Sequence, residues 1–507
     1  MAVLSSQQLG RRRSIVAEPK YDVIVVGSGF GGVTCAALLA KSGLKTLVLE
    51  KNNRVGGKQM GWSSRGFKGE LWPTYGIPIE VGPFVEAFTE LGIHSKLDII
   101  PGSNALMYKR PGGEWVTTVN RAGKQETDAT ENMFKAWQLA PQERDVALQA
   151  LAEMVLLAPE QLEALDEVSV QQWVAQRGDM PRPLFGFFAV QANLMATGMY
   201  ELVAMSELSR IMQIFGGSTT GYPRGGYARL VGDIVDVLKA NGGEVRTRAR
   251  VEKILVEDGR VTGVTTEDKV FRAPIVVSNA GIQPTVLKLV GEEHFDKAYV
   301  NYVKGIVPSL GFTCQRYIFS RPVLEHGVYI GTSEDSYIDV PRLDEIRDGK
   351  IPETVSVYGV VPANFDPEMA PPGKQMLLIG TWCSPDPGGK EVRLLQRKVD
   401  QQFDEMFPEA VPYIESREGY VGPAQVAALS RDAVLPGLGG EAVGLGVTVG
   451  YCGRNKPSPK APISGLFYVG HDAGGGAFVG THQVVSSGLR VAELVRHYFL
   501  ERKAVRR

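Results

Sequence analysis

The first fifty residues contain blocks of apolar and small side chains whose order predicts two strands on either side of a helix. Val23–Val26 is an apolar run with the length of a buried strand, and Thr46–Leu49 is a second one. Between them, the small and apolar residues 33–41 predict a helix that packs closely on its neighbours. The turn that joins the first strand to this helix contains Gly27, Gly29, Phe30, Gly31 and Gly32.

The glycines of this turn have the spacing of strand–turn–helix units that bind a dinucleotide. Gly27 permits the tight turn, Gly29 lets the backbone approach a diphosphate, and Gly32 allows the helix to pack on the strand. The helix N-terminus offers free N–H groups and a partial positive charge. Glu50 ends the second strand, about twenty residues further on, where a carboxylate can bind a ribose hydroxyl. The pattern and its context together predict a bound dinucleotide.

Later parts of the chain repeat these strand and helix patterns. After the turn at 222–226, an amphipathic helix is expected over 227–241. The remaining elements expected are strands within 243–251, 273–281 and 465–472, a hairpin around 258–260 and a helix over 483–499.

Two long segments lie between these parts and have different patterns. Residues 96–222 are expected to be mostly helical, with helices that begin near Thr130, Pro141 and Ser169. In residues 286–461, turns rich in Pro and Gly separate strands expected over 309–319, 354–361 and 375–381. We expect this second segment to supply a sheet that lines a substrate cavity.

One stretch of the helical segment, residues 183–199, contains no charged side chain. A buried helix is the simplest interpretation, and a hydrophobic tunnel or a shallow contact with a membrane surface are the alternatives. The stretch is too short, and with Gln191, Asn193 and Thr197 too polar, to suit a bilayer span.

The residues after Glu50 indicate which dinucleotide is bound. Lys51 follows directly, and Gly56, Gly57 and Lys58 come a few residues later. A carboxylate followed by a basic residue and a Gly-Gly pair is typical of flavoproteins that bind FAD. With the segments 222–226, 273–281 and 465–472, these residues make the chain resemble the phytoene desaturase-like (carotenoid desaturase and isomerase) family of FAD-dependent oxidoreductases, within the amine-oxidase-like flavoprotein superfamily.

The resemblance covers most of the chain and implies an α/β fold with three parts. A discontinuous Rossmann-like FAD-binding domain would comprise residues 20–95, 223–285 and 462–499. Residues 96–222 would form a helical cap insertion, with a face that could meet a membrane, and residues 286–461 a mixed-sheet substrate domain. Residues 1–19 are expected to be a flexible tail.

The resemblance also implies which residues hold FAD. Asp472 stands where relatives bind the flavin ribityl chain or the diphosphate, and the glycine run 474–476 would allow close backbone approach. The last helix would point its N-terminus at the flavin ring and stabilise negative charge there. The expected cofactor-binding residues are Gly27, Gly29, Phe30, Gly31, Gly32, Glu50, Lys51, Gly56, Gly57, Lys58, Val251, Asn279, Ala280, Asp472, Gly480 and Thr481.

Three positions depart from the family pattern. His482 stands about where carotenoid desaturases have a Pro-Gly pair, and His471 precedes Asp472 where a small residue is common. Either histidine could shuttle a proton near the flavin, because the ordinary histidine pKa lies near neutral pH. The alternative is that the rings only pack there, or that His482 caps its helix. Trp72 replaces a glycine close to the flavin or substrate, which favours a substrate smaller than, or shaped differently from, a long carotenoid.

Composition adds few constraints. The formal net charge of −1 argues against nucleic-acid binding. The four cysteines are scattered without a CxxC pair, which argues against a disulfide framework or metal site and favours a reducing cytoplasm. No apolar run is long enough to cross a membrane, and the arginines 11–13 are not followed by the apolar segment of an export signal. A peripheral membrane contact remains an alternative.

These inferences predict an FAD-dependent dehydrogenase or desaturase. It would remove a hydride from a C–H bond of a lipophilic, isoprenoid or alicyclic molecule and introduce a C=C or C=O bond. Because a second glycine-rich nucleotide motif is lacking, oxygen, a quinone or a redox protein is the expected electron acceptor. The alternatives are a redox-neutral double-bond isomerase, an amine oxidase, whose aromatic cage is not visible in the sequence, and a non-enzymatic carrier of prenylated proteins of the GDP-dissociation-inhibitor type.

Overall fold

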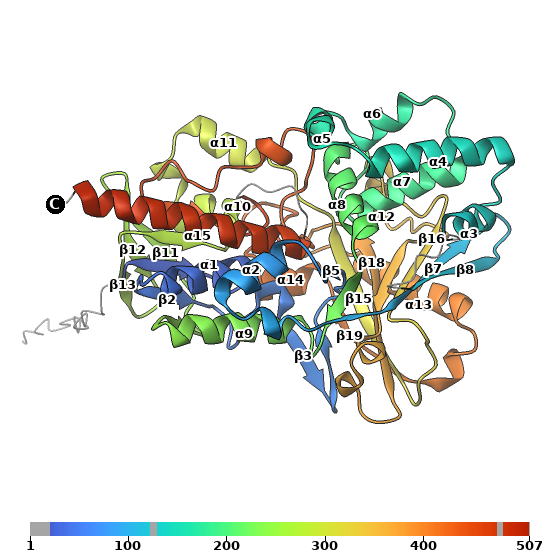
Figure 1. Cartoon of the computed structure of the whole chain (residues 1–507), viewed down its shortest axis with the longest axis horizontal. Coiled ribbons are helices and arrows are strands. Elements are labelled where there is room, and N and C mark those ends of the chain that lie inside the picture. The colour runs from blue at the N-terminus through green and yellow to red at the C-terminus, as the bar shows by residue number, and fades with distance from the viewer. Residues whose placement is uncertain (1–20, 122–128, 474–479, 506–507) are drawn as a thin grey trace, which may run out of the picture.

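The computed structural model describes residues 21–121, 129–473 and 480–505, which form two lobes (Figure 1). The parallel-sheet lobe, on the left of Figure 1, contains α1 (Phe30–Lys41), α9 (Tyr227–Ala240) and α15 (Gly480–Val505). The mixed-sheet lobe, on the right, combines a large sheet with a group of cap helices. The α/β fold class expected from the sequence is confirmed. The expected tail 1–19 and the glycine run 474–476 lie outside the described residues.

The parallel-sheet lobe is built on a five-stranded sheet in the order β10–β2–β1–β14–β20, with every neighbouring pair parallel. β1 and β2 are apolar and buried throughout, as interior strands of a parallel sheet between helices must be. The strands come from three distant parts of the sequence. Their bounds are β1 (Val23–Val26), β2 (Thr46–Leu49), β10 (Glu244–Arg246), β14 (Val276–Ser278) and β20 (Leu466–Tyr468).

Close helix packing completes this lobe, and α1 lies against both α9 and α15. Gly488 of α15 makes one of these contacts tight. A Cβ atom added there would lie 2.8 Å from the Thr34 Cβ atom and 3.0 Å from the Gly31 carbonyl oxygen. A small antiparallel sheet extends the lobe, with its first hairpin at Asp258 as expected, and consists of β11 (Lys253–Glu257), β12 (Arg260–Thr265) and β13 (Val270–Arg272).

The mixed sheet has seven strands in the order β19–β15–β18–β17–β16–β7–β8. The strands expected over 309–319, 354–361 and 375–381 are confirmed as β15, β17 and β18. The bounds are β7 (Ser103–Lys109), β8 (Trp115–Arg121), β15 (Gly311–Phe319), β16 (Val328–Ser333), β17 (Val357–Val360), β18 (Gln375–Cys383) and β19 (Ile414–Val421).

The hairpin of β7 and β8 corrects one expectation, because it lies within residues 96–222, which were expected to be mostly helical. β7 pairs with β16 and so joins the mixed sheet. Two short runs with apolar, aromatic or β-branched residues around the turn Pro111, Gly112 and Gly113 are a hairpin signal that the helical expectation overlooked. The cap therefore begins only after this hairpin.

The cap helices otherwise agree with the sequence. Helices begin at Ala129, close to Thr130, and at Pro141, and Ser169 caps the next predicted helix by accepting a hydrogen bond from the Gln172 N–H group. The bounds are α3 (Ala129–Ala136), α4 (Pro141–Val155), α5 (Pro159–Ala164), α6 (Val170–Ala175), α7 (Arg182–Leu194) and α8 (Met205–Gly217).

The uncharged stretch 183–199 forms most of α7. Leu184, Phe188 and Ala192 of this helix are buried in one apolar cluster with Trp173 and Leu208. The interpretation as a buried helix is therefore confirmed. Over residues 21–121, 129–473 and 480–505, no helix is both long and apolar enough to traverse a bilayer.

Short elements connect the two lobes. They include a two-stranded sheet, β3–β4, and a three-stranded sheet in the order β5–β9–β6. The strands of these two sheets are β3 (Gly61–Ser64), β4 (Phe67–Glu70), β5 (Ile77–Pro78), β6 (Ile99–Pro101) and β9 (Thr220–Pro223). Further helices of the two lobes are α2 (Pro83–Leu91), α10 (Ile282–Pro284), α11 (Lys297–Gly305), α12 (Val340–Arg347), α13 (Val392–Met406) and α14 (Pro423–Leu429).

Two helix glycines provide a matched test of the packing between α1 and α15. Gly488→Ala should lower the thermal midpoint, because overpacking costs roughly 1–3 kcal/mol and outweighs a helix-propensity gain of about 1 kcal/mol. Gly232→Ala in α9 should raise the midpoint, because an added Cβ there meets no atom within 4 Å. Thermal unfolding followed by circular dichroism measures both, and a stabilised Gly488→Ala variant would contradict the tight contact.

Candidate functional site

A cavity of about 2350 Å³, counting the part that opens to solvent, lies between the parallel sheet, the mixed sheet and the cap. One wall is formed by segments that follow the carboxyl ends of β1, β2, β14 and β20. Parallel strands bring such segments to a single edge of a sheet, which is where α/β folds bind ligands. With the exception of Gly32, every cofactor-binding residue expected from the sequence lines the cavity, as do His471 and His482.

Asn279, directly after β14, connects the glycine turn to β20. In the orientation that satisfies its amide, the side-chain oxygen accepts a hydrogen bond from the Gly29 N–H group at 3.2 Å, and the nitrogen donates to the Val469 carbonyl at 3.1 Å. A Cβ atom at Gly29 would lie 2.8 Å from the polar end of the Asn279 side chain. Gly32 points away from the cavity, and a Cβ atom there would approach the Gly27 carbonyl oxygen to 2.4 Å, so this glycine serves packing.

The N-terminus of α1 fits a diphosphate. No side chain caps the helix at Gly29, and its first turn has no acidic residue, so its N–H groups stay available for an anion at the cavity wall. The Gly-Gly pair packs onto this turn, since a Cβ atom at Gly57 would lie 3.1 Å from the Gly29 Cα atom. A Cβ atom at Gly56 would instead lie 3.1 Å from the backbone of Met60.

Glu50 and Lys51 line the same wall but already have protein partners. One carboxylate oxygen of Glu50 accepts hydrogen bonds from the backbone N–H and the hydroxyl of Ser28, and the other accepts two from Asn52, each at 2.8 Å. A ribose hydroxyl would add to these bonds. The Lys51 ammonium pairs with Asp432 at 3.0 Å.

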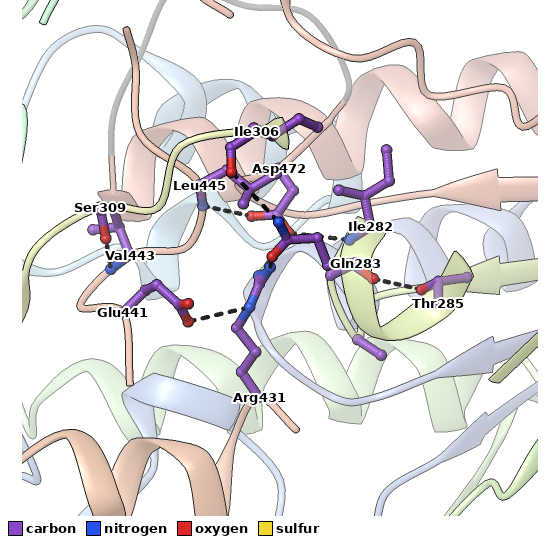
Figure 2. Close-up of polar contacts among 12 residues, drawn as sticks. Ile282, Gln283, Thr285, Ile306, Ser309, Arg431, Glu441, Val443, Leu445 and Asp472 are labelled. Atoms are coloured by element: carbon purple, nitrogen blue, oxygen red, sulfur yellow. Dashed lines mark hydrogen bonds and ion pairs between the residues drawn. The ribbon is translucent and has the colours of Figure 1, made fainter. Parts of the chain in front are cut away.

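Arg431 is a site residue that the sequence analysis missed. Its Nη1 atom donates to Asp472 at 2.6 Å, and its Nε atom lies 3.2 Å from Glu441 (Figure 2). Asp472 also accepts hydrogen bonds from the backbone N–H groups of Ile282 and Leu445, at 3.0 and 2.9 Å. Burial alone would raise the pKa of Asp472, but Arg431 and the Leu445 N–H group together outweigh burial and hold that pKa below its usual value. The arginine thus keeps the aspartate ionised at the cofactor wall.

Lys58 differs from the other charged residues of this wall. No ion pair or hydrogen bond joins its ammonium to another residue in the part of the chain that the structure describes. Burial and the positive charge of Arg431 lower its pKa to about 8, although Glu441 and Asp472 act in the opposite direction. A partly desolvated cation without a partner is a suitable contact for an anionic ligand.

The two histidines do not have the pKa that proton shuttling near neutral pH requires. Burial lowers the pKa of His482 to about 4, and burial together with the charge of Lys456 lowers that of His471 to about 3. His482 Nε2 lies 3.0 Å from the Gly76 carbonyl oxygen, to which it donates, and its ring packs edge-on against Phe84. The interpretation of His482 as a packing residue is therefore favoured. A catalytic role for either ring stays a prediction and would use neutral imidazole.

The opposite wall is one face of the mixed sheet together with the cap. Strand register explains which side chains share this face. Tyr358 pairs with Ile330, Asn104 pairs with Val328 and Phe312 pairs with Trp382, and all six line the cavity. Trp72 and the cap residues Leu194, Met195, Ile211 and Phe215 complete the wall. The aromatic rings come from separate elements, so only alternation along each strand could have hinted at their grouping.

The sequence as a whole decides the family. Residues 30–496 match the family described as flavin containing amine oxidoreductase. The chain belongs to this family.

Individual relatives agree with the assignment. The chain is 26% identical over 418 residues to the inactive all-trans-retinol 13,14-reductase of Danio rerio, a match that covers 72% of this chain and 66% of that relative. It is 24% identical to the lycopene-forming phytoene desaturase of a Paracoccus species, over 69% of this chain and 72% of the relative. An oxidoreductase from Methanosarcina mazei has a similar fold, with a TM-score of 0.69 at 20% identity over 93% of this chain and 99% of that one. The resemblance to phytoene desaturases is confirmed.

The protein is therefore an FAD-dependent oxidoreductase, and its residues fit that cofactor. When bound, FAD supplies the two-electron redox chemistry, while the protein supplies binding and electrostatics. The α1 N-terminus and Lys58 would hold the diphosphate, and Glu50 the adenosine ribose. Arg431 would hold Asp472 ionised, as an acceptor for the ribityl chain or the diphosphate side of the cofactor. The apolar side chains of the opposite wall exclude water from the space beyond.

Lys58 should make FAD binding depend on pH. In the free protein its pKa is about 8, and an anionic diphosphate favours the charged form of the side chain. The FAD affinity of the apoprotein should stay level below that pH and then fall by up to about tenfold per pH unit, because binding must take up a proton. Fluorescence titration with FAD across this range measures the effect. The Lys58→Arg variant should keep its affinity for FAD at high pH. The Lys58→Met variant should bind FAD weakly at every pH, and a wild-type pH profile in this variant would contradict the role of Lys58.

Proposed function

We propose that this FAD-dependent oxidoreductase removes a hydride from a C–H bond of a neutral, lipophilic molecule and leaves a C=C or C=O bond in the product. One observation carries the proposal: the sheet-and-cap wall of the cavity has no charged side chain among the described residues. A neutral molecule can be desolvated against such a wall, whereas an ion would lose hydration without gaining a partner.

The relatives support an isoprenoid or alicyclic skeleton. The names of two of them refer to phytoene and to retinol, which are isoprenoids. The end of α7 contributes Leu194 and Met195 to the wall, so the buried helix of the stretch 183–199 also lines part of the cavity. Oxygen, a quinone or a redox protein stays the proposed electron acceptor.

An amine substrate is the second candidate. The description of the family refers to amine oxidoreductases, and several aromatic rings lie on the cavity wall. Trp72, Phe312, Tyr358 and Trp382 could attract a cation through their ring faces. No carboxylate of the described residues accompanies them on this wall. The neutral substrate is therefore favoured.

Anaerobic mixing separates these candidates. Flavin-loaded protein should lose its yellow absorbance with isoprenoid or steroid donors and keep it with primary and secondary amines. Bleaching by amines alone, with hydrogen peroxide released on admitting air, would overturn the proposal. Product formation that needs pre-reduced flavin but consumes no acceptor would identify a double-bond isomerase instead.

Trp72 is expected to limit the size of the substrate. Its indole is buried on the cavity wall, so Trp72→Leu should enlarge the cavity and raise kcat/KM for bulkier donors relative to smaller ones. Trp115→Leu, which changes a tryptophan outside the cavity, is the matched control and should leave this ratio unchanged. An equal shift in both variants would show that the effect comes from lost stability.

A further inference from the structure

The cavity wall opposite the cofactor segments is apolar, yet it carries polar atoms that find no partner in the protein. The side-chain oxygen of Asn104 is buried and accepts no hydrogen bond from any described residue. The indole N–H groups of Trp72 and Trp382 likewise have no described acceptor. Buried polar groups in native proteins are normally paired, so several unpaired ones on one cavity wall require an explanation.

Tyr358 lies on the same wall, and its hydroxyl is not among the fully covered polar atoms. It is half-buried on the cavity wall, and no described residue forms a hydrogen bond with its hydroxyl. Burial, with smaller contributions from Tyr75 and Glu70, raises the pKa of Tyr358 far above neutral pH, so the hydroxyl keeps its proton and can donate it. A hydrocarbon packed against this wall would displace water from the phenol hydroxyl and offer no hydrogen-bond acceptor in its place.

The strand register places Tyr358 at the centre of the wall. Its neighbour on β16 is Ile330, which lines the cavity, and its neighbour on β18 is Gly380, which has no side chain to cover the phenol. Asn104 lies on the same face of the sheet, two strands away and beside Val328. The Tyr358 hydroxyl is thus a hydrogen-bond donor on an otherwise apolar surface of the cavity.

We propose that Tyr358 selects oxygenated lipophilic substrates by donating a hydrogen bond to a hydroxyl or carbonyl oxygen. The inference rests on the proposed function and narrows it. The substrate class becomes isoprenoid or alicyclic alcohols and ketones, while pure hydrocarbons of the same skeleton become poor ligands. Phenylalanine at position 358 would suit a hydrocarbon substrate better, because it would remove the unpaired hydroxyl.

The test uses flavin-loaded, full-length protein and matched pairs of compounds. Farnesol, geranylgeraniol and cholesterol are each compared with the hydrocarbon that lacks the hydroxyl, and binding is measured by perturbation of the oxidised flavin spectrum. The wild type should bind at least one alcohol roughly three- to tenfold tighter than its hydrocarbon, as one net hydrogen bond would give. Tyr358→Phe should reduce the preference to within about twofold without weakening hydrocarbon binding.

Tyr108→Phe is the matched control, since this hydroxyl is also buried without a described partner but lies outside the cavity lining. It should keep the full preference for alcohols. Equal binding of alcohols and hydrocarbons by the wild type, or an undiminished preference in Tyr358→Phe, would overturn the role of Tyr358 and leave the proposed function standing. If none of the lipophilic compounds perturbs or bleaches the flavin, the proposed function fails as well.

Discussion

Close packing around one asparagine side chain is the constraint on which the cofactor wall depends. Asn279 lies within contact distance of every position where a Cβ atom could be added to Gly27, Gly29, Gly31, Gly32 and Gly470. These glycines come from two strand ends that are far apart in the sequence, and the asparagine itself comes from a third. Larger residues at these positions would separate the strands, and the helix N-terminus of α1 would no longer face the cavity.

The charges of the cavity are divided in the same way as its walls. On the cofactor side, Arg431 neutralises the buried acids Asp472 and Glu441, and the Lys58 cation is left for an anionic ligand. On the substrate side, only neutral polar groups interrupt the apolar surface. A second buried set of charges lies within the cap, where Arg210 of α8 pairs with Glu207 of the same helix and with Asp166. The cavity thus has charged side chains where the cofactor carries charge and, among the described residues, none on its substrate wall.

The sequence predicted the cofactor wall far better than the substrate wall. Glycine spacing and Glu50 mark the former because the backbone must approach a phosphate closely, and this requirement leaves a local signature. Arg431 leaves none, since it lies 41 residues before its partner Asp472 in a segment without regular structure. Tyr358 and Trp382 share a wall only through strand register, which a single sequence does not reveal. The sequence analysis named His471 and His482 but did not predict that they are neutral, because burial, not residue type, sets their pKa.

The order of the strands also determines when, during synthesis, the cofactor wall is complete. β1, at the centre of the sheet, is synthesised first, whereas β20 and the first turn of α15 come from the last part of the chain. A growing polypeptide on the ribosome therefore exposes the glycine turn for most of translation before its closing segment exists. A chain cut short before Leu466 would lack β20 and leave β14 as an unpaired edge, open to chaperones or to aggregation.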